Sequence, residues 1–292
     1  MKQVRKAIIP AAGMGTRMLP IARCVPKEML PIVDRPAISY LVEEAAKSGI
    51  TDVLIITGRD KDAIEDYFDY SPEYDELLLK KGRGDEVEQL HDSSCGANVY
   101  FIRQKERRGL GHAISVARSF VGDEPFCVLY GDDIIFSQRP VCAQLIDTYN
   151  KYGRPVVGVK SVAPELIGRY CSMKAEPIDG AKGEYYVDDM IEKPKPEQVF
   201  SNLAILGRVL LTPEIFDILE RTAPGAGGEI QLTDAMAEYA RAYGVTALEF
   251  EGTRYDMGSK HGFMYANIEQ GLKNAEIGED LREFIRNIAK TL

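Results

Sequence analysis

The first apolar run of the chain is Ala7-Ile8-Ile9, continued by Pro10-Ala11-Ala12-Gly13-Met14-Gly15-Thr16-Arg17-Met18-Leu19-Pro20 and then by Pro26-Lys27-Glu28-Met29-Leu30-Pro31. The apolar residues predict a buried strand that ends in a loop of small residues. Small residues allow a flat ring or a phosphate to approach the backbone, and glycine can turn N–H groups toward an anion. Arg17 can bind phosphate oxygens through two hydrogen bonds, and Lys27 adds a compact positive charge. Together these features indicate a triphosphate site.

Two common phosphate motifs do not fit this loop. Met18 stands where a dinucleotide fingerprint has its third glycine, and Thr16-Arg17 replaces the Gly-Lys-Thr of a P-loop. A tight strand-to-helix turn would account for the glycines alone. It leaves the two cations and the flanking prolines without a reason.

Composition limits the class of protein. The chain has 292 residues, of which 45% are hydrophobic, enough for a large core in one large or two smaller domains. The net charge of −9 argues against general affinity for nucleic acid or for an anionic membrane, although a local cationic pocket is compatible with it. No apolar run approaches the length of a membrane span, and residues 1–6 leave no room for a signal peptide before the first strand. Five cysteines without paired or zinc spacing indicate reduced thiols, and we expect a cytoplasmic protein.

Strands and helices alternate in the first half of the chain. We expect strands at 7–9, 51–57, 98–102, 125–130 and 156–159, and helices at 36–49, 60–68, 109–120 and 140–152. The charged stretch 70–95 predicts an inserted helix or helical pair with a solvated face, and the alternative is that its apolar side meets a second subunit. This alternation predicts an α/β fold of three layers, with a Rossmann-like mixed, mostly parallel sheet and helices on both faces.

The regular alternation of strands and helices does not continue in the second half of the chain. We expect strands at 185–191, 203–211 and 245–250. We also expect one helix that begins at 212–214, a second helix at 231–243, and closing helices at 259–273 and 279–289. No flexible linker separates the halves. The sequence therefore favours a single domain over residues 1–292, with a nucleotide-binding half (1–160) and a sugar-phosphate-binding half with the C-terminal helices (161–292).

Acidic residues follow two predicted strand ends. Asp132, in Gly131-Asp132-Asp133, comes after a buried strand, where ligands of open parallel sheets bind. A carboxylate there can hold Mg²⁺ against phosphate oxygens, although a polar turn would explain the dipeptide equally well. Asp256 lies in the turn Tyr255-Asp256-Met257-Gly258-Ser259, where helix capping is the alternative.

Other candidate residues lie farther along the chain. Gln104 ends a predicted strand, and its amide suits the edge of a pyrimidine, to which Gly109 can present its backbone. His112, in the first helical turn, is more typical of a structural histidine. Lys193 can contact a sugar phosphate and Glu192 sugar hydroxyls, or the two can form an ordinary salt pair at a strand end.

These motifs together resemble the sugar-phosphate nucleotidylyltransferase family. The resemblance rests on the glycine loop and Pro26-Lys27-Glu28-Met29-Leu30-Pro31, on Gln104 with Gly109-Leu110-Gly111-His112-Ala113, on Asn202-Leu203-Ala204-Ile205, on Gly228-Glu229-Ile230-Gln231-Leu232-Thr233-Asp234 and on Tyr255-Asp256-x-Gly258-Ser259. Thymidylyl-transferring members usually have Lys-Gln-Leu-Leu-Pro, so Glu28-Met29 favours the bacterial uridylyl-transferring members, which use UTP and glucose 1-phosphate.

The resemblance implies a role for each matching residue. It implies nucleotide binding by Ala11, Ala12, Gly13, Gly15, Thr16, Gln104 and Gly109, catalysis by Arg17 and Lys27, Mg²⁺ binding by Asp132 and Asp256, and sugar-phosphate binding by Cys171, Glu192, Lys193 and Asn202. It also implies a homo-oligomer, dimer or tetramer. Related enzymes for dTTP or another sugar phosphate, a catalytically silent regulatory paralogue and an NAD-dependent oxidoreductase are the alternatives.

Cys171 marks a departure from the family. Arg169-Tyr170-Cys171 stands where the family commonly has Arg-Tyr-Gly, so a side chain replaces a glycine whose backbone approaches the sugar. Two readings stay open: the cysteine adjusts the sugar site, or it points into the core and never meets the sugar.

Overall fold

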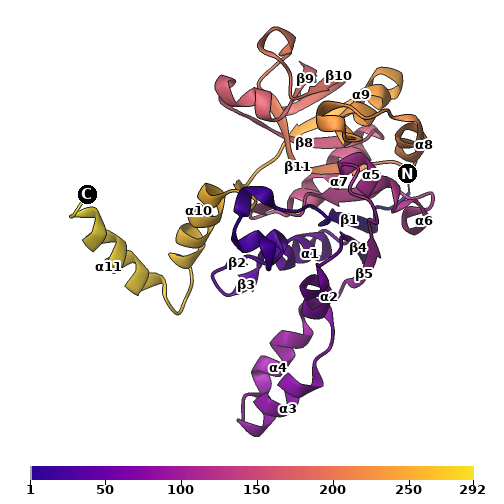
Figure 1. Cartoon of the computed structure of the whole chain (residues 1–292). Coiled ribbons are helices and arrows are strands. Elements are labelled where there is room, and N and C mark those ends of the chain that lie inside the picture. The colour runs from indigo at the N-terminus through magenta and orange to yellow at the C-terminus, as the bar shows by residue number, and fades with distance from the viewer. Residues whose placement is uncertain (1) are drawn as a thin grey trace.

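A nine-stranded sheet forms the centre of the protein (Figure 1). The structure is a computed structural model and describes residues 2–292. Across the sheet the order is β5-β4-β1-β6-β11-β8-β12-β10-β9. The strands are β1 (Lys6–Pro10), β4 (Asp52–Thr57), β5 (Asn98–Arg103), β6 (Phe126–Leu129), β8 (Val156–Ser161), β9 (Cys171–Pro177), β10 (Glu184–Glu192), β11 (Leu203–Leu211) and β12 (Val245–Glu249).

The sheet is mixed but mostly parallel, as the sequence predicts. β1 pairs in parallel with β4 and β6, β4 with β5, and β12 with β8. β11 runs antiparallel to β6 and β8, and β10 runs antiparallel to β12 and β9. Of the strands in this sheet, β10 and β11 therefore run against the common direction. The Rossmann-like expectation for the fold is confirmed.

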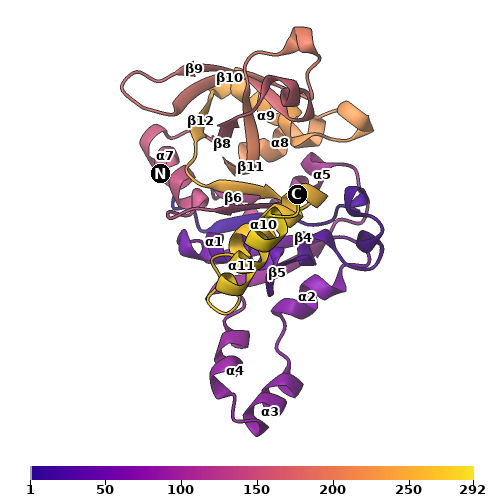
Figure 2. The same ribbon diagram turned by 90° about the vertical axis from the view of Figure 1, so that its left-hand side faces the viewer.

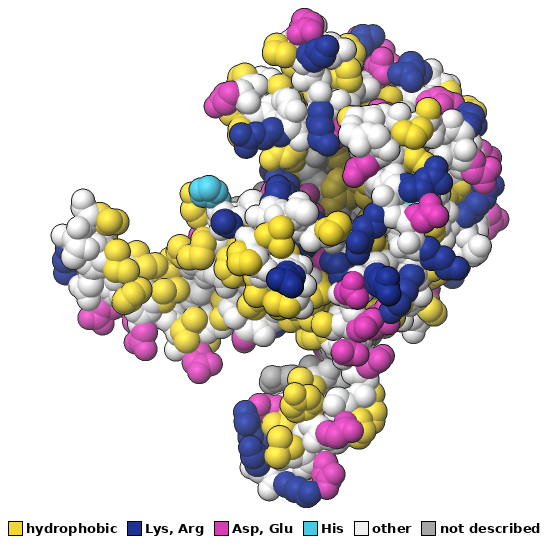
Figure 3. Space-filling view, viewed as in Figure 1, with side chains coloured by type: hydrophobic (Ala, Val, Ile, Leu, Met, Phe, Trp, Pro, Cys, Tyr) yellow, Lys and Arg dark blue, Asp and Glu magenta, His cyan; other side chains and the backbone are white. Residues whose placement is uncertain are grey.

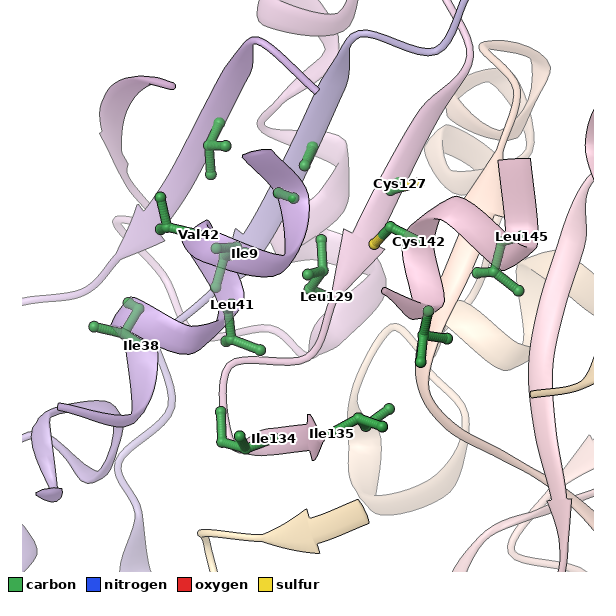
Figure 4. Packing of buried hydrophobic residues seen from close by; sticks show 14 of the residues in the cluster. Ile9, Ile38, Leu41, Val42, Cys127, Leu129, Ile134, Ile135, Cys142 and Leu145 are labelled. Atoms are coloured by element: carbon green, nitrogen blue, oxygen red, sulfur yellow. The ribbon is translucent and has the colours of Figure 1, made fainter. Parts of the chain in front are cut away.

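Helices cover both faces of the sheet, because alternate strand residues point to opposite sides. On β1, Ile9 joins the core under α1 and α7, whereas Ile8 joins the core under α5, α8 and α9. Figure 4 shows part of the first core, where Leu41 and Cys142 pack near Ile9 and Leu129. The helices are α1 (Ala37–Lys47), α2 (Asp62–Phe68), α3 (Pro72–Lys80), α4 (Gly84–His91), α5 (Leu110–Ser115), α6 (Arg118–Val121), α7 (Val141–Tyr152), α8 (Glu214–Arg221), α9 (Leu232–Tyr243), α10 (Lys260–Gly271) and α11 (Gly278–Ala289).

Two small ribbons lie outside the main sheet. β7 (Asp133–Phe136) pairs antiparallel with β13 (Thr253–Asp256), and β2 (Pro31–Ile32) pairs with β3 (Arg35–Pro36). The first ribbon joins segments that are far apart in the sequence, and it positions residues of the candidate site. Short 3-10 helices complete the chain: η1 (Thr16–Met18), η2 (Ile21–Arg23), η3 (Lys27–Met29), η4 (Pro164–Arg169), η5 (Pro196–Gln198) and η6 (Ala226–Gly228).

The structure corrects one predicted helix. The expected helix 109–120 is two short helices, α5 and α6, because the chain tightens between them. The N–H of Ala117 donates to the carbonyl of Ile114, three residues back, at 3.0 Å, which interrupts the α-helical hydrogen-bond pattern. The stretch 70–95 is a helical pair, α3 and α4, in agreement with one of the two expected forms.

Two arms extend from the body of the molecule. α3 and α4 form one arm, and α10 with α11 forms the other (Figures 1 and 2). We expected α11 to close the fold, but it projects from the body, and of its residues Gly278 alone is buried. Among residues 2–292, no helix combines the length and the apolar character needed to cross a membrane.

Candidate active site

The loop after β1 lies at the carboxyl end of the sheet. The N–H of Ala11 donates to the Ile56 carbonyl of β4 at 2.8 Å, so the loop continues the parallel pairing before it turns away. Gly15 has a φ of 65°, and a Cβ there would come within 3.3 Å of Ala22 and 3.4 Å of Lys27. The turn therefore requires a glycine, and it directs η1 and η3 back over the end of the sheet.

The β7–β13 ribbon brings the two aspartates together. Asp256 is paired with Asp133 across the ribbon, and the N–H of Met257 donates to the Asp132 carbonyl at 2.7 Å. Although Asp132 and Asp256 lie far apart in the sequence, both carboxylates face the loop that carries Arg17.

Two cations contact these carboxylates directly. Arg17 Nη1 donates to Asp256 Oδ2 at 2.8 Å, and its Nη2 lies 3.4 Å from Asp132 Oδ2. Lys27 Nζ donates to the same Asp132 Oδ2 at 2.6 Å. The four residues therefore form one charge cluster, built from η1, η3, the residue just before β7 and the last residue of β13.

Opposite charges within the cluster shift the pKa values of Asp132 and Lys27. Burial alone would raise the pKa of Asp132, but Lys27 and Arg17 outweigh it and lower that pKa. Burial likewise works against charged Lys27, yet Asp132 and Glu28 raise its pKa overall. For neighbouring Asp133, burial dominates and, with Asp132 and Asp256 nearby, raises the pKa to about 6 despite the Arg254 guanidinium.

The aspartate pair fits a divalent cation that also binds a substrate. A Cβ at Gly258 would come within 2.5 Å of Asp132 Oδ2, 2.6 Å of Arg17 Nη2 and 3.0 Å of Asp256 Oδ1, so glycine leaves room for a cation beside the two carboxylates. The Arg17 guanidinium already stands between them as a cation. Within the described residues 2–292, no group of three or more His, Cys, Asp or Glu side chains could hold a metal. Two hard carboxylates plus phosphate oxygens and water suit Mg²⁺, which retains several non-protein ligands.

A cavity of about 440 Å³ lies beside the cluster. In Figure 3 the surface is hollowed between the upper and lower parts of the molecule, with Lys and Arg side chains at the rim. A cavity of this volume suits a nucleotide. Its lining comprises Pro10, Ala12, Gly13, Met14, Thr16, Lys27, Glu28, Gln104, Arg107, Gly109, Leu110, Ala113, Tyr130, Gly131, Asp132 and Glu229.

Gln104 and Gly109 form the end of the cavity away from the ribbon. Gln104 Nε2 donates to the Gly109 carbonyl at 3.2 Å and lies 2.9 Å from His112 Nδ1. Both contacts use the amide nitrogen, so the amide oxygen stays available for a donor on a ligand. Gly109 has a φ of 104°, and a Cβ there would approach Glu229 to 2.7 Å, so glycine is required where two loops meet.

The four residues with expected sugar roles lie apart from this lining. Glu192 Oε2 accepts from Thr233 Oγ1 at 2.8 Å, the Lys193 side chain is 52% exposed, and the Asn202 carbonyl accepts from Val162 N at 3.0 Å. The Cys171 side chain is buried, and its Sγ accepts a hydrogen bond from the Ile205 N–H at 3.3 Å. Of the two readings of Cys171, its side chain therefore adopts the core position.

Comparison with known proteins identifies the family. A family model described as nucleotidyl transferase matches residues 6–271. The chain belongs to the nucleotidyl transferase family. It is 50% identical over 288 residues to UTP–glucose-1-phosphate uridylyltransferase 2 of Staphylococcus saprophyticus, with 99% of each chain covered. It is 49% identical over 290 residues to UTP–glucose-1-phosphate uridylyltransferase YngB of Bacillus subtilis, covering 99% of this chain and 97% of the relative.

Solved structures are similar over nearly the whole chain. A UDP-glucose pyrophosphorylase complexed with UDP-glucose has a TM-score of 0.84 and 40% identity, covering 93% of this chain and all (100%) of that one. A UTP-bound UGPase from Acinetobacter baumannii has a TM-score of 0.89 and 33% identity, covering 97% and 99% of the two chains.

Several cavity residues of this nucleotidyl transferase were not predicted from the sequence, and Arg107 and Tyr130 are two of them. Arg107 Nε donates to the Ala12 carbonyl at 2.8 Å and so fixes the glycine loop; its position in a cationic pair just before Gly109 was an available signal. Tyr130 is largely enclosed, and burial, with Cys171 and Glu192 nearby, raises the pKa of its hydroxyl. Tyr130 lines the cavity and packs against the core cluster that contains Cys171, although an apolar strand end gave no sign of this.

Proposed function

We propose that this protein transfers a uridylyl group from UTP to glucose 1-phosphate, giving UDP-glucose and pyrophosphate. The observation that carries the proposal is the convergence of Arg17, Lys27, Asp132 and Asp256 beside a nucleotide-sized cavity. The names of relatives that are about half identical over the full chain support the choice of substrates.

The nucleotide would lie between Gln104 and the glycine loop. The free oxygen of Gln104 accepts the ring N–H of uracil, and the Gly109 backbone meets the same ring. The small residues Ala11, Ala12, Gly13, Gly15 and Thr16 leave the loop backbone close to the phosphates. Arg17 stabilises the negative charge that develops on the leaving phosphates.

The sugar phosphate would enter from the C-terminal half, whose division from the nucleotide half near residue 160 is part of this proposal. Lys193 contacts the sugar phosphate, and Glu192 and Asn202 contact sugar hydroxyls. The Cys171 side chain supports that region by packing, and its backbone alone faces the sugar side. Lys27 bridges the α-phosphate and the sugar phosphate.

The reaction requires positioning more than proton transfer. An oxygen of glucose 1-phosphate attacks the α-phosphorus in line, the bond from that phosphorus to the β-phosphate bridging oxygen breaks, and pyrophosphate leaves with the electron pair. Because the attacking phosphate is already ionised, no strong base is needed. Asp132 and Asp256 would hold Mg²⁺, which neutralises phosphate charge when it is bound.

A pyrophosphate-release assay over a panel of nucleotides and sugar 1-phosphates tests the proposal, with Lys27→Ala prepared in parallel to exclude a contaminating enzyme. We expect UTP with glucose 1-phosphate to give the highest kcat/KM. Preference for dTTP would make the protein a thymidylyltransferase. Inactivity with every pair would favour a regulatory paralogue.

We also propose that the protein forms a homo-oligomer through α11. Ile277, Phe284 and Ile288 are 41%, 61% and 43% exposed and share one helical face. Acidic Glu279 and Asp280 lie in the first turn of the helix, and basic Arg286 lies in its last turn. Antiparallel contact with α11 of a second copy would cover both apolar faces and bring opposite charges together.

A further inference from the structure

Arg17 occupies the space between the two carboxylates of the candidate cation site. Its Nη1 donates to Asp256 Oδ2 at 2.8 Å, and its Nη2 lies 3.2 Å from Asp256 Oδ1 and 3.4 Å from Asp132 Oδ2. The guanidinium therefore uses the carboxylate oxygens that a divalent cation would need. A cation and Arg17 cannot both hold these oxygens, because they would compete for the same space and repel each other.

Arg17 is free to leave, whereas the carboxylates are held in place. The Arg17 side chain is 60% exposed and belongs to a three-residue 3-10 helix. Asp256 Oδ1 accepts the Gly258 N–H at 2.9 Å, and Asp132 Oδ2 accepts a hydrogen bond from Lys27 Nζ at 2.6 Å. The Lys27 side chain, by contrast, is only 16% exposed, so it is the less mobile of the two cations.

We propose that Arg17 is the resident counter-ion of the cation site, and that the nucleotide completes this site by drawing Arg17 onto its phosphates. The proposal rests on the proposed function for the identity of the nucleotide. In the free protein Arg17 competes with a divalent cation. Once the phosphates pair with Arg17, they also supply the ligands that the two aspartates lack.

Two consequences follow from this exchange. The free protein binds a divalent cation weakly, even though its carboxylates are already in position. Nucleotide and cation each strengthen the binding of the other by the same factor, because the coupling between two binding sites is reciprocal.

Binding of Mn²⁺ to the free protein, followed by electron paramagnetic resonance, tests the exchange without requiring turnover. Arg17→Ala is compared with Arg23→Ala, which removes the same charge from the neighbouring helix η2, where Arg23 is exposed and forms no ion pair with the described residues. We expect Arg17→Ala to bind Mn²⁺ on the order of tenfold more tightly than wild type, and Arg23→Ala to bind it as wild type does.

Asp256→Asn in the Arg17→Ala background shows where the gained ion binds. The double variant should lose the gain in Mn²⁺ affinity that Arg17→Ala produces. Mg²⁺ should likewise raise the melting temperature of Arg17→Ala more than that of the wild type. Equal affinities in Arg17→Ala and wild type, an equal gain in Arg23→Ala, or a gain that persists in the double variant would each overturn the exchange. Wild-type activity in the substrate panel would stand in any of these cases, so the two proposals fail separately.

Discussion

At the scale of single residues, Lys27 differs from Arg17 in how firmly it is held. Lys27 lies beneath the glycine loop, with Asp132 on one side and buried Glu28 on the other. Glu28 in turn pairs with Lys61 at 2.6 Å, in a site where both side chains are nearly inaccessible. The Lys27 ammonium is therefore a fixed point charge at the cavity wall.

Replacement of Lys27 should mainly affect turnover. Lys27→Ala should lower kcat about 100-fold, because a preorganised positive charge is lost where phosphate charge develops. Lys27→Arg should fail to restore kcat, since a planar guanidinium does not fit a compact enclosed position. Steady-state kinetics with both substrates provides the measurement. Wild-type kcat in Lys27→Arg would show that the position needs only a positive charge.

Cys171 should matter for stability and not for sugar preference. The β11–β8 register shifts between Ile205 and Val209, and the Cys171 thiol accepts the Ile205 N–H beside this irregularity. Cys171→Gly should therefore lower the free energy of unfolding by about 2 kcal/mol. Cys171→Ser, which keeps an acceptor, should lose less. Denaturant melts together with kcat/KM for glucose and galactose 1-phosphates test this. A changed sugar preference with unchanged stability would place Cys171 in the sugar site.

The chemical types at the site could be predicted from the sequence, but their contacts could not. Small residues and cations after an apolar strand indicate a phosphate site wherever the chain places them. The position of Arg17 between two aspartates depends on a pairing of distant segments. The core position of Cys171 likewise depends on a local register shift in another strand, which no short motif encodes.

At the scale of elements, the β7–β13 ribbon determines the spacing of the aspartates. A two-stranded ribbon is marginal by itself, so its attachments to the body matter. Arg254 Nε donates to Asp133 Oδ1 at 2.7 Å across the ribbon. Fully buried Arg208 donates to the Asp133 carbonyl at 2.8 Å and pairs with Glu44 of α1 at 2.7 Å. The ribbon is thus fixed to the core behind the site.

Loss of the Arg254 contact should misplace the aspartates. Arg254→Met keeps the length of the side chain but leaves Asp133 without that partner, so we expect kcat to fall and the Mg²⁺ concentration for half-maximal activity to rise. Arg254→Lys should partly restore both the kcat and the Mg²⁺ concentration for half-maximal activity. Arg139→Met, at an exposed ion pair with Asp147, is the control. A lower melting temperature with unchanged kcat and unchanged Mg²⁺ dependence would limit Arg254 to a structural role.

Long periodic segments were predictable, and short or polar ones were not. Apolar runs such as 51–57 and 203–211 identify their own strands. β9, with the sequence Cys171-Ser172-Met173-Lys174-Ala175-Glu176-Pro177, mixes polar residues into an edge strand, and β7 and β13 have four residues each. Such strands depend on their partners for stability, so local sequence carries little sign of them.

At the scale of the whole molecule, the two arms lead to different expectations. α3 and α4 pack against each other, whereas α11 projects from the body and leaves Phe284 and Ile288 61% and 43% exposed. An isolated helix of this length is marginal in water, so contact with a second copy is the expected source of its stability.

Phe284→Glu should therefore yield monomers, because it introduces a charge at the centre of the proposed α11 contact. Leu79→Glu, at a residue that is 60% exposed on the other arm, should leave the assembly unchanged. Sedimentation velocity measures both. Monomers of Leu79→Glu, together with an unchanged assembly of Phe284→Glu, would assign the subunit contact to the α3–α4 arm.

We propose that the charge cluster around Asp132 and Asp256 carries out uridylyl transfer. ³¹P nuclear magnetic resonance of the purified protein with UTP, glucose 1-phosphate and Mg²⁺ tests it most directly. We predict equimolar UDP-glucose and pyrophosphate from the wild type and from Asp147→Asn, an exposed control, and about 100-fold slower formation by Asp132→Asn and Asp256→Asn. Turnover by both aspartate variants at the wild-type rate would show that these carboxylates take no part in the reaction.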